Sequence, residues 1–140
     1  MDLLGIGIDL IELDRVRAVL KRHGNRFLDR IYTVPERQRA AQMADPTPFL
    51  AGRFAAKEAV LKVLGTGLTG GITWQDVSVL REPSGAPRVA LARKAFDRAR
   101  KLGMGRILIT ITHSRELAMA QAMGIAGDPA GLELRCILPG

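Results

Sequence analysis

The segment from Arg53 to Gly67, RFAAKEAVLKVLGTG, constrains the fold more than any other part of the chain, because it is typical of one long helix with a defined end. Thr47 is expected to cap this helix, and Pro48 suits its first turn. Gly65 and Gly67 are expected to end it, since glycine accepts the left-handed conformation that follows a helix C-terminus. We therefore predict a central helix around which the remaining elements pack.

Two sides of this helix are apolar. At 100° per residue, Leu50, Phe54, Leu61 and Leu64 form one stripe, and Ala56, Ala59, Val60 and Val63 cover much of the opposite side. Glu58 and Lys62 lie one turn apart on the remaining face, where small neighbours leave room for a ligand. Such a pair is most often a solvated ion pair worth a few tenths of a kcal/mol. Because the helix offers little polar surface, a functional interpretation is equally open.

The length of 140 residues and the share of charged residues, 25%, predict one folded domain. The first residues lack a basic region and are interrupted by acids, so we expect neither a signal peptide nor a membrane span. Cys136 is the one cysteine of the chain and can form no internal disulfide. These features predict a cytoplasmic protein in which Cys136 is incidental.

A net charge of +7 favours anionic partners: nucleic acid, phosphorylated small molecules or an acidic protein. The chain has few aromatic residues, and they do not alternate with basic residues as a base-stacking surface requires. Nucleic acid is therefore the weaker candidate partner.

The order of predicted elements indicates an α+β fold with an antiparallel sheet. The expected strands are 3–11, 72–80, 87–91, 107–112 and 117–125, and the expected helices besides the central one are 14–23, 27–31, 34–43 and 92–102. The first strand contains Gly5 and Gly7, which favour a buried strand closely approached by other backbone. The last strand is expected to pair back on strand 107–112. Residues 1–125 form the predicted domain, and 126–140 are a tail without an assigned element.

Three predicted elements carry four polar groups that could converge. Asp9 ends the first strand, Glu58 and Lys62 lie on the central helix, and His113 follows strand 107–112. Two carboxylates on separate rigid elements suit Mg²⁺, which takes one or two protein carboxylates and completes its octahedron with water and phosphate oxygens. A cluster of cysteines and histidines, as zinc sites require, is missing. Asp9 alone could equally cap a loop, which is the commoner fate of a lone aspartate.

Several blocks of the sequence resemble the holo-acyl-carrier-protein synthases, which are small 4′-phosphopantetheinyl transferases. The similar blocks are GIGIDLIELDR (5–15), FLDRIYTVPE (27–36), FLAGRFAAKEAVLKVLGTG (49–67), WQDV (74–77), GAP (85–87) and ITHS (111–114). Together they span residues 4 to about 124 in the order typical of the family. The resemblance implies the fold of that family, with an antiparallel sheet packed on a long central helix.

The resemblance also implies a reaction. In it, the phosphopantetheine arm of coenzyme A is transferred, with Mg²⁺, to a serine of apo acyl carrier protein, and adenosine 3′,5′-bisphosphate is released. Asp9 and Glu58 would bind the metal, and Lys62 would contact the pyrophosphate. Coenzyme A would contact Arg53, Lys62, Gly65, Pro87, Arg88, His113 and Ser114. The family is typically homotrimeric with sites between subunits, so Asp9 and the central helix of one chain would face the hairpin of the next.

For the acidic carrier protein we expect the first helix to be the binding surface, with Arg15 and Arg22 as contacts, because this helix follows the strand that ends in Asp9. The carrier could serve fatty-acid biosynthesis, and hence lipid metabolism, or polyketide synthesis. The proton of the attacking serine could be taken by Glu58 or by a metal-bound water; a carboxylate committed to Mg²⁺ is the poorer base.

Two other classes of function compete with the enzyme. A basic nucleic-acid-binding module would explain the charge, and a duplex-binding assay with a salt titration would identify it. It leaves Glu58 and Lys62 without a role. A non-catalytic scaffold of the same fold is disfavoured by the presence of Asp9, Glu58 and Lys62 together.

Overall fold

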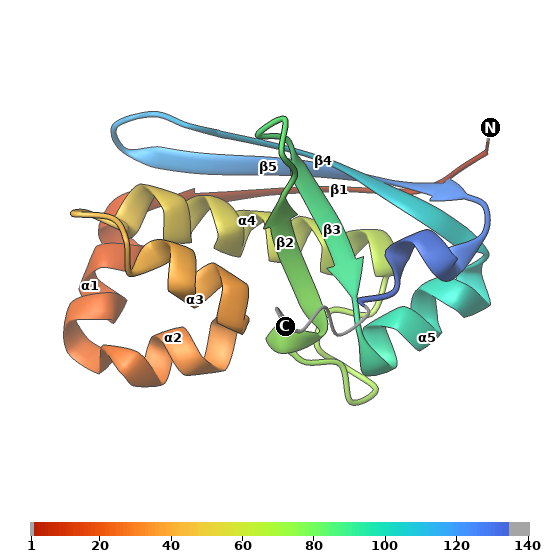
Figure 1. The fold of residues 1–140 in the computed structure, drawn as a ribbon, viewed down its shortest axis with the longest axis horizontal. Coiled ribbons are helices and arrows are strands. Elements are labelled where there is room, and N and C mark those ends of the chain that lie inside the picture. The colour runs from red at the N-terminus through yellow and green to blue at the C-terminus, as the bar shows by residue number, and fades with distance from the viewer. Residues whose placement is uncertain (1, 135–140) are drawn as a thin grey trace.

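Helix α4 (Thr47–Leu64) runs along one face of a three-stranded antiparallel sheet (Figure 1). The sheet has the order β1-β5-β4 and consists of β1 (Leu3–Glu12), β5 (Leu117–Ala126) and β4 (Met104–His113). The computed structural model describes residues 2–134, so Cys136 lies outside the described residues. The predicted central helix and the β4–β5 pairing are both confirmed, and Gly65 ends α4 with a φ of 76°.

The remaining elements cover the side of α4 turned away from this sheet (Figure 1). They are α1 (Leu13–His23), α2 (Asn25–Ile31), α3 (Val34–Ala40), the antiparallel pair β2 (Val77–Arg81) and β3 (Pro87–Leu91), α5 (Arg93–Leu102), and the short 3-10 turns η1 (Trp74–Asp76) and η2 (Pro129–Leu132). The α+β class and the antiparallel sheets agree with the sequence analysis. Within residues 2–134 no helix has the length and apolar character that crossing a membrane requires.

Several predicted element ends are wrong, each because a polar side chain starts or stops the element elsewhere. Thr47 is the first helical residue of α4 rather than its cap, and its N–H donates to Asp45 Oδ1 at 3.1 Å. This hydrogen bond lowers the pKa of Asp45. Strand β2 begins at Val77 rather than at residue 72, because the Asp76 carboxylate accepts hydrogen bonds from Thr73 and holds η1.

Two helix predictions also need correction. Helix α1 begins at Leu13 rather than at residue 14, and Asp14 in its first turn pairs with Arg17 at 2.6 Å. Helix α3 ends at Ala40 rather than near Met43, and the chain continues in a turn.

Strand β1 approaches α4 closely, as its glycines predict, but it is buried on one face only. A Cβ atom on Gly7 would lie 2.1 Å from the Ala59 carbonyl oxygen, and one on Gly5 would lie 2.8 Å from the Val63 carbonyl oxygen. The alternate residues of β1 turn away from α4 and are exposed in the single chain: Leu4, Ile6, Ile8 and Leu10. The prediction of a fully buried strand is therefore wrong for the isolated chain.

The first part of the tail, for which no element was predicted, packs on the core. Leu132 of η2 is buried there, and the Leu134 N–H donates to the Leu91 carbonyl at 2.7 Å. The proposed domain boundary at residue 125 stays a prediction.

An ion pair between Glu36 and Lys57 lies in the centre of the molecule. Lys57 Nζ is 2.7 Å from Glu36 Oε1, and both side chains are essentially inaccessible to solvent. Lys57 also donates to the carbonyls of Trp74 and Val77, while Glu36 Oε2 accepts from the Val79 N–H at 2.7 Å. The pair therefore joins α3, α4 and the start of β2. Burial lowers the pKa of Lys57, and the Glu36 charge partly offsets this shift.

We expect the substitution Lys57→Met to lower the free energy of unfolding by about 3–5 kcal/mol, because it leaves the Glu36 carboxylate buried without a counter-charge. Urea denaturation measures the change, and the exposed Lys21→Met serves as control. The double variant E36Q/K57M is expected to recover part of the loss, since no buried charge remains. An unchanged unfolding midpoint for Lys57→Met would contradict the structural role of the pair.

Candidate active site

The structure brings Asp9, Glu58 and Lys62 together where β1 crosses α4. Lys62 Nζ donates to the Ile8 carbonyl at 2.6 Å and lies 3.4 Å from Asp9 Oδ1. Asp9 and Glu58 line one cavity of about 390 Å³, which we call the carboxylate pocket. Of the four polar groups expected to converge, Asp9, Glu58 and Lys62 do so, whereas His113 lines a different cavity and the prediction is wrong for it.

The carboxylate pocket is electrostatically strained. Partial burial, and then the charge of Asp9, raise the pKa of Glu58, while Lys62 acts in the opposite direction. Lys62 is more exposed than its position on an apolar helix suggests, with 52% of its side chain accessible, against 20% for Asp9. Because two mutually repelling carboxylates face only one cation here, a further positive charge between them would be favourable.

Two carboxylates are all that the described residues supply for a metal at this place. Residues 2–134 contain no group of three or more His, Cys, Asp or Glu side chains that could hold an ion. A site with two carboxylate oxygens matches the ligand set of Mg²⁺, which completes its coordination with water and phosphate, and not that of a structural zinc. The donor set therefore fits Mg²⁺.

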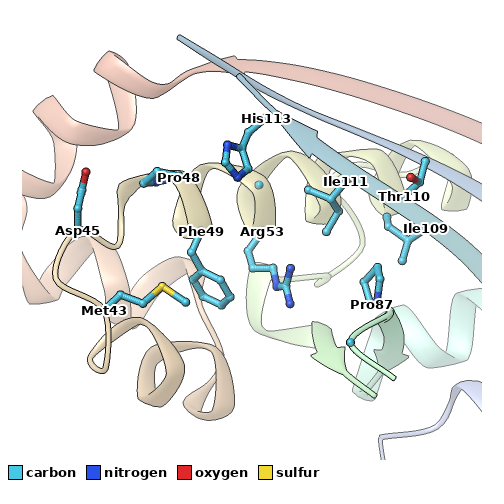
Figure 2. A pocket seen from close by; sticks show the side chains of 12 residues that line it. Met43, Asp45, Pro48, Phe49, Arg53, Pro87, Ile109, Thr110, Ile111 and His113 are labelled. Atoms are coloured by element: carbon cyan, nitrogen blue, oxygen red, sulfur yellow. The ribbon is translucent and has the colours of Figure 1, made fainter. Parts of the chain in front are cut away.

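A second cavity, of about 480 Å³, lies on the other side of α4 and is called here the arginine pocket. Figure 2 shows Arg53 projecting from α4 into the same space as Pro87 and Ile111, with His113 at its upper edge. Arg53, Pro87 and His113, which were predicted from the resemblance, are thus brought together, and Gly85 also lines the cavity.

Arg53 is a half-buried cation with unused hydrogen-bonding capacity. Its Nε is buried and has no acceptor among residues 2–134. Burial lowers the pKa of Arg53, which the Glu36 charge partly offsets. Its guanidinium carbon lies 4.7 Å from the centre of the Phe49 ring, a cation–π distance that fixes the side chain.

Other predicted contacts lie outside both cavities. Arg88 pairs with Leu80 in the β2–β3 ladder and does not line the arginine pocket. Ser114 Oγ accepts the N–H groups of Glu116 and Leu117 in the β4–β5 turn, at 3.3 and 3.2 Å. Gly65 lies at the end of α4.

The single chain does not unite the two cavities into one site. Asp9 lies on β1 and His113 on β4, and these are the two edge strands of the three-stranded sheet. The carboxylate pocket and the arginine pocket share no lining residue.

The two residues predicted to meet the carrier protein both lie on α1. Arg15 lines the carboxylate pocket, together with the partly exposed Val19. Arg22 lies in the last turn of α1 and is exposed. The neighbouring Arg17 is engaged by Asp14 at 2.6 Å.

Sequence reasoning missed Phe49 in the arginine pocket and the Glu36–Lys57 pair behind the site. An aromatic residue four positions before Arg53 on the same helix was a usable signal for the first. A lysine that follows two alanines, Ala55 and Ala56, on an otherwise apolar part of the helix was a signal for the second, but only the fold shows its partner.

Comparison with known proteins agrees with these observations. The family model of the 4′-phosphopantetheinyl transferase superfamily matches residues 5–123. The chain therefore belongs to the 4′-phosphopantetheinyl transferase superfamily. It is 40% identical to the holo-[acyl-carrier-protein] synthase of Chlamydia pneumoniae over 90% of this chain and 100% of that protein.

Two solved structures show the same fold. The holo-(acyl-carrier-protein) synthase of Bacillus anthracis in complex with CoA (3′,5′-ADP) superposes with a TM-score of 0.75 at 34% identity, covering 89% of this chain and 98% of that one. The Helicobacter pylori enzyme in complex with coenzyme A gives a TM-score of 0.76 at 27% identity, covering 86% and 99%. The enzyme class of the chain is accordingly that of the holo-[acyl-carrier-protein] synthases.

Replacing Glu58 with Gln is expected to raise the melting temperature at pH 7 in metal-free buffer by about 1–3 °C, after allowance for solvent screening. The pKa of Glu58 is higher in the folded chain than in the unfolded one, so the ionised carboxylate opposes folding at neutral pH. The difference should shrink as the pH falls to about 4, where the unfolded chain is protonated as well. Thermal melts at both pH values measure it.

Glu82→Gln in the exposed β2–β3 turn is the matched control and should show no such pH-dependent gain. A lower melting temperature for Glu58→Gln at pH 7 would contradict the electrostatic strain in the carboxylate pocket.

Proposed function

We propose that the enzyme transfers 4′-phosphopantetheine from coenzyme A to a serine of apo acyl carrier protein in the cytoplasm, in a Mg²⁺-dependent reaction that releases adenosine 3′,5′-bisphosphate. The observation that carries the proposal is the pairing of Asp9 and Glu58 beside Lys62, because two carboxylates and a lysine are what a metal-assisted attack on a phosphoanhydride requires.

Asp9 and Glu58 would hold the Mg²⁺. The ion, when bound, neutralises charge on the pyrophosphate oxygens as the phosphoanhydride breaks. Lys62, one turn further along α4, lies 3.4 Å from Asp9 Oδ1 and would donate hydrogen bonds to oxygens of the leaving phosphate. We assign the serine proton to a water molecule in the pocket rather than to Glu58, whose carboxylate is committed to the cation.

The arginine pocket would bind the nucleotide end of coenzyme A. The guanidinium charge of Arg53 suits a phosphate group, and Pro87 with Ile111 offers apolar surface to the adenosine. His113 lies at the rim, where it would meet the same phosphate. Arg88, Ser114 and Gly65 remain proposed contacts that a neighbouring chain would have to bring into reach.

The carrier protein would dock on α1. Arg15 and Arg22 offer positive charge, and Val19 offers apolar surface beside the carboxylate pocket. An acidic amphipathic helix complements both properties, and electrostatic attraction of this kind mainly accelerates association. Carrier proteins of fatty-acid synthesis are the proposed substrates.

We further propose a homotrimer, because the isolated chain exposes an apolar sheet face and separates the two pockets. Leu4, Ile6, Ile8 and Leu10 are 42–57% exposed along β1, and Met119 and Leu108 extend this face across the sheet. Exposed apolar rows of this size mark interaction sites. Packing copies around this face would place the carboxylate pocket of one chain beside the arginine pocket of the next.

Incubation with coenzyme A, Mg²⁺ and an apo acyl carrier protein is expected to add one phosphopantetheine to the carrier, seen by mass spectrometry and abolished by EDTA. Asp9→Asn and Glu58→Gln should each reduce transfer to background and remain folded. In the absence of substrates, Mg²⁺ should raise the melting temperature of the unsubstituted chain but not of either variant. Full activity of Asp9→Asn would remove the metal role of that residue.

A mixture of two inactive variants is expected to recover activity if the site is shared between chains. Asp9→Asn leaves the arginine pocket intact, and Arg53→Gln leaves the carboxylate pocket intact. In trimers assembled at equal ratio, about one interface in four combines two intact pockets. Transfer by the co-refolded mixture should therefore exceed the sum of the separate variants. Activity equal to that sum, in particles that light scattering shows to be trimers, would place the whole site within one chain.

A further inference from the structure

A cluster of cationic side chains on α5 lies apart from both pockets described above. Lys94, Arg98 and Lys101 recur at intervals of four and three residues, so they project from one side of the helix. They line a cavity of about 220 Å³ between α5 and the glycine-rich loop that follows α4, here called the α5 pocket. Its lining includes no residue of the carboxylate pocket or of the arginine pocket.

The positive charge of the α5 pocket is not compensated within the described part of the chain. Residues 2–134 form no ion pair with Lys94, Arg98 or Lys101. In contrast, Arg93 at the start of the same helix lies 2.7 Å from the buried Asp76 carboxylate.

One carboxylate, that of Asp97, also lines the pocket. It lies 3.8 Å from Arg100, which is a loose contact on the exposed side of the helix. With three cations and one carboxylate, the pocket retains a net positive charge of about two, the charge that a phosphate dianion would neutralise.

The opposite wall of the pocket is a loop rich in hydrogen-bond donors. Gly67, Gly70 and Gly71 have φ values of 56°, 69° and 84°, a left-handed backbone that side-chain-bearing residues rarely adopt. A turn closes the loop, with Thr69 Oγ1 donating to the Thr66 carbonyl at 2.6 Å. Gly70 lines the pocket, and its N–H has no acceptor among residues 2–134. Backbone N–H groups in glycine loops are common anion ligands.

The arginine of the cluster is held in place before any ligand arrives. Arg98 Nε donates to the Leu64 carbonyl at the C-terminus of α4 at 3.0 Å, which leaves its terminal nitrogens free. The stem of Lys94 lies along the loop, with its Cγ 3.6 Å from the position of a Cβ atom on Gly71. Both cations are therefore oriented by packing and by a main-chain contact, which lowers the entropic cost of ligand binding.

We propose that the α5 pocket is a binding site for a phosphate group, separate from the catalytic site. The two terminal guanidinium nitrogens of Arg98 match the spacing of two phosphate oxygens. Lys94 and Lys101 add positive charge, and the loop adds a main-chain N–H donor. The volume accommodates inorganic phosphate or the phosphate of a small metabolite. The same chemistry could come from free phosphate or from the nucleotide product of the transfer reaction.

An amide-resolved NMR titration of the whole protein with inorganic phosphate, at constant ionic strength, tests the site. Saturable shifts are expected for the amides of Gly67, Gly70 and Gly71. The double variant K94Q/K101Q should weaken this binding by about tenfold or more. The matched control R26Q/R30Q removes two exposed charges from α2 and should leave it unchanged. A second titration with adenosine 3′,5′-bisphosphate distinguishes the two sources, since a product bound only at the catalytic site, near Gly65, produces no shift of Gly70 that K94Q/K101Q weakens.

Loop shifts that K94Q/K101Q and R26Q/R30Q weaken equally would show general charge attraction and overturn the site. Phosphate shifts confined to the carboxylate and arginine pockets would overturn it as well. Transfer of phosphopantetheine by K94Q/K101Q is expected to match that of the control. A loss specific to K94Q/K101Q would place these lysines in the transfer reaction and contradict a separate site.

Discussion

The buried ion pair of Glu36 and Lys57 is the interaction on which the rest of the structure depends. The pair joins α3 and β2 to α4 close to Arg53, which lines the arginine pocket, and Glu58, which lines the carboxylate pocket. A buried pair of this kind adds little net stability compared with well-packed apolar residues, but either partner alone is costly. Any arrangement of α3, α4 and β2 that separates the two side chains leaves a buried charge unpaired and is disfavoured. The pair thereby selects which faces of α4 point to the sheet and to the β2–β3 hairpin.

This arrangement divides the chemistry between the two edges of one sheet. The carboxylates lie beside β1 and the arginine pocket lies beside β4, with α4 between them. The apolar outer face of the sheet and the separation of the two pockets would both be explained by the proposed trimer, in which a neighbouring chain covers this face and completes the site.

The sequence predicted the elements that follow from periodicity and glycine placement, and it predicted less where tertiary contacts decide. The central helix and the β4–β5 hairpin follow from spacing alone, and Asp9, Glu58 and Lys62 do converge. The start of β2 was misplaced because the Asp76 carboxylate competes for the backbone before it. Lys57 was overlooked because its partner is 21 positions away in the chain and only the fold brings the two together. The exposed face of β1 was taken for core because its leucine and isoleucine residues are as apolar as those of a buried strand.

The two glycines of β1 have a consequence for how the metal site is assembled. Because the backbone of β1 rests directly on the carbonyl oxygens of Ala59 and Val63, steric contact sets the height of the strand above α4. The separation between Asp9 and Glu58 is then a property of main-chain packing and not of the charges themselves. The repulsion between the carboxylates cannot relax by moving the strand outward without losing this contact and the β1–β5 ladder. The free energy of that repulsion is thereby retained in the folded chain and would be released on binding of the proposed cation, so that the rigidity of the scaffold would contribute to affinity for the ion.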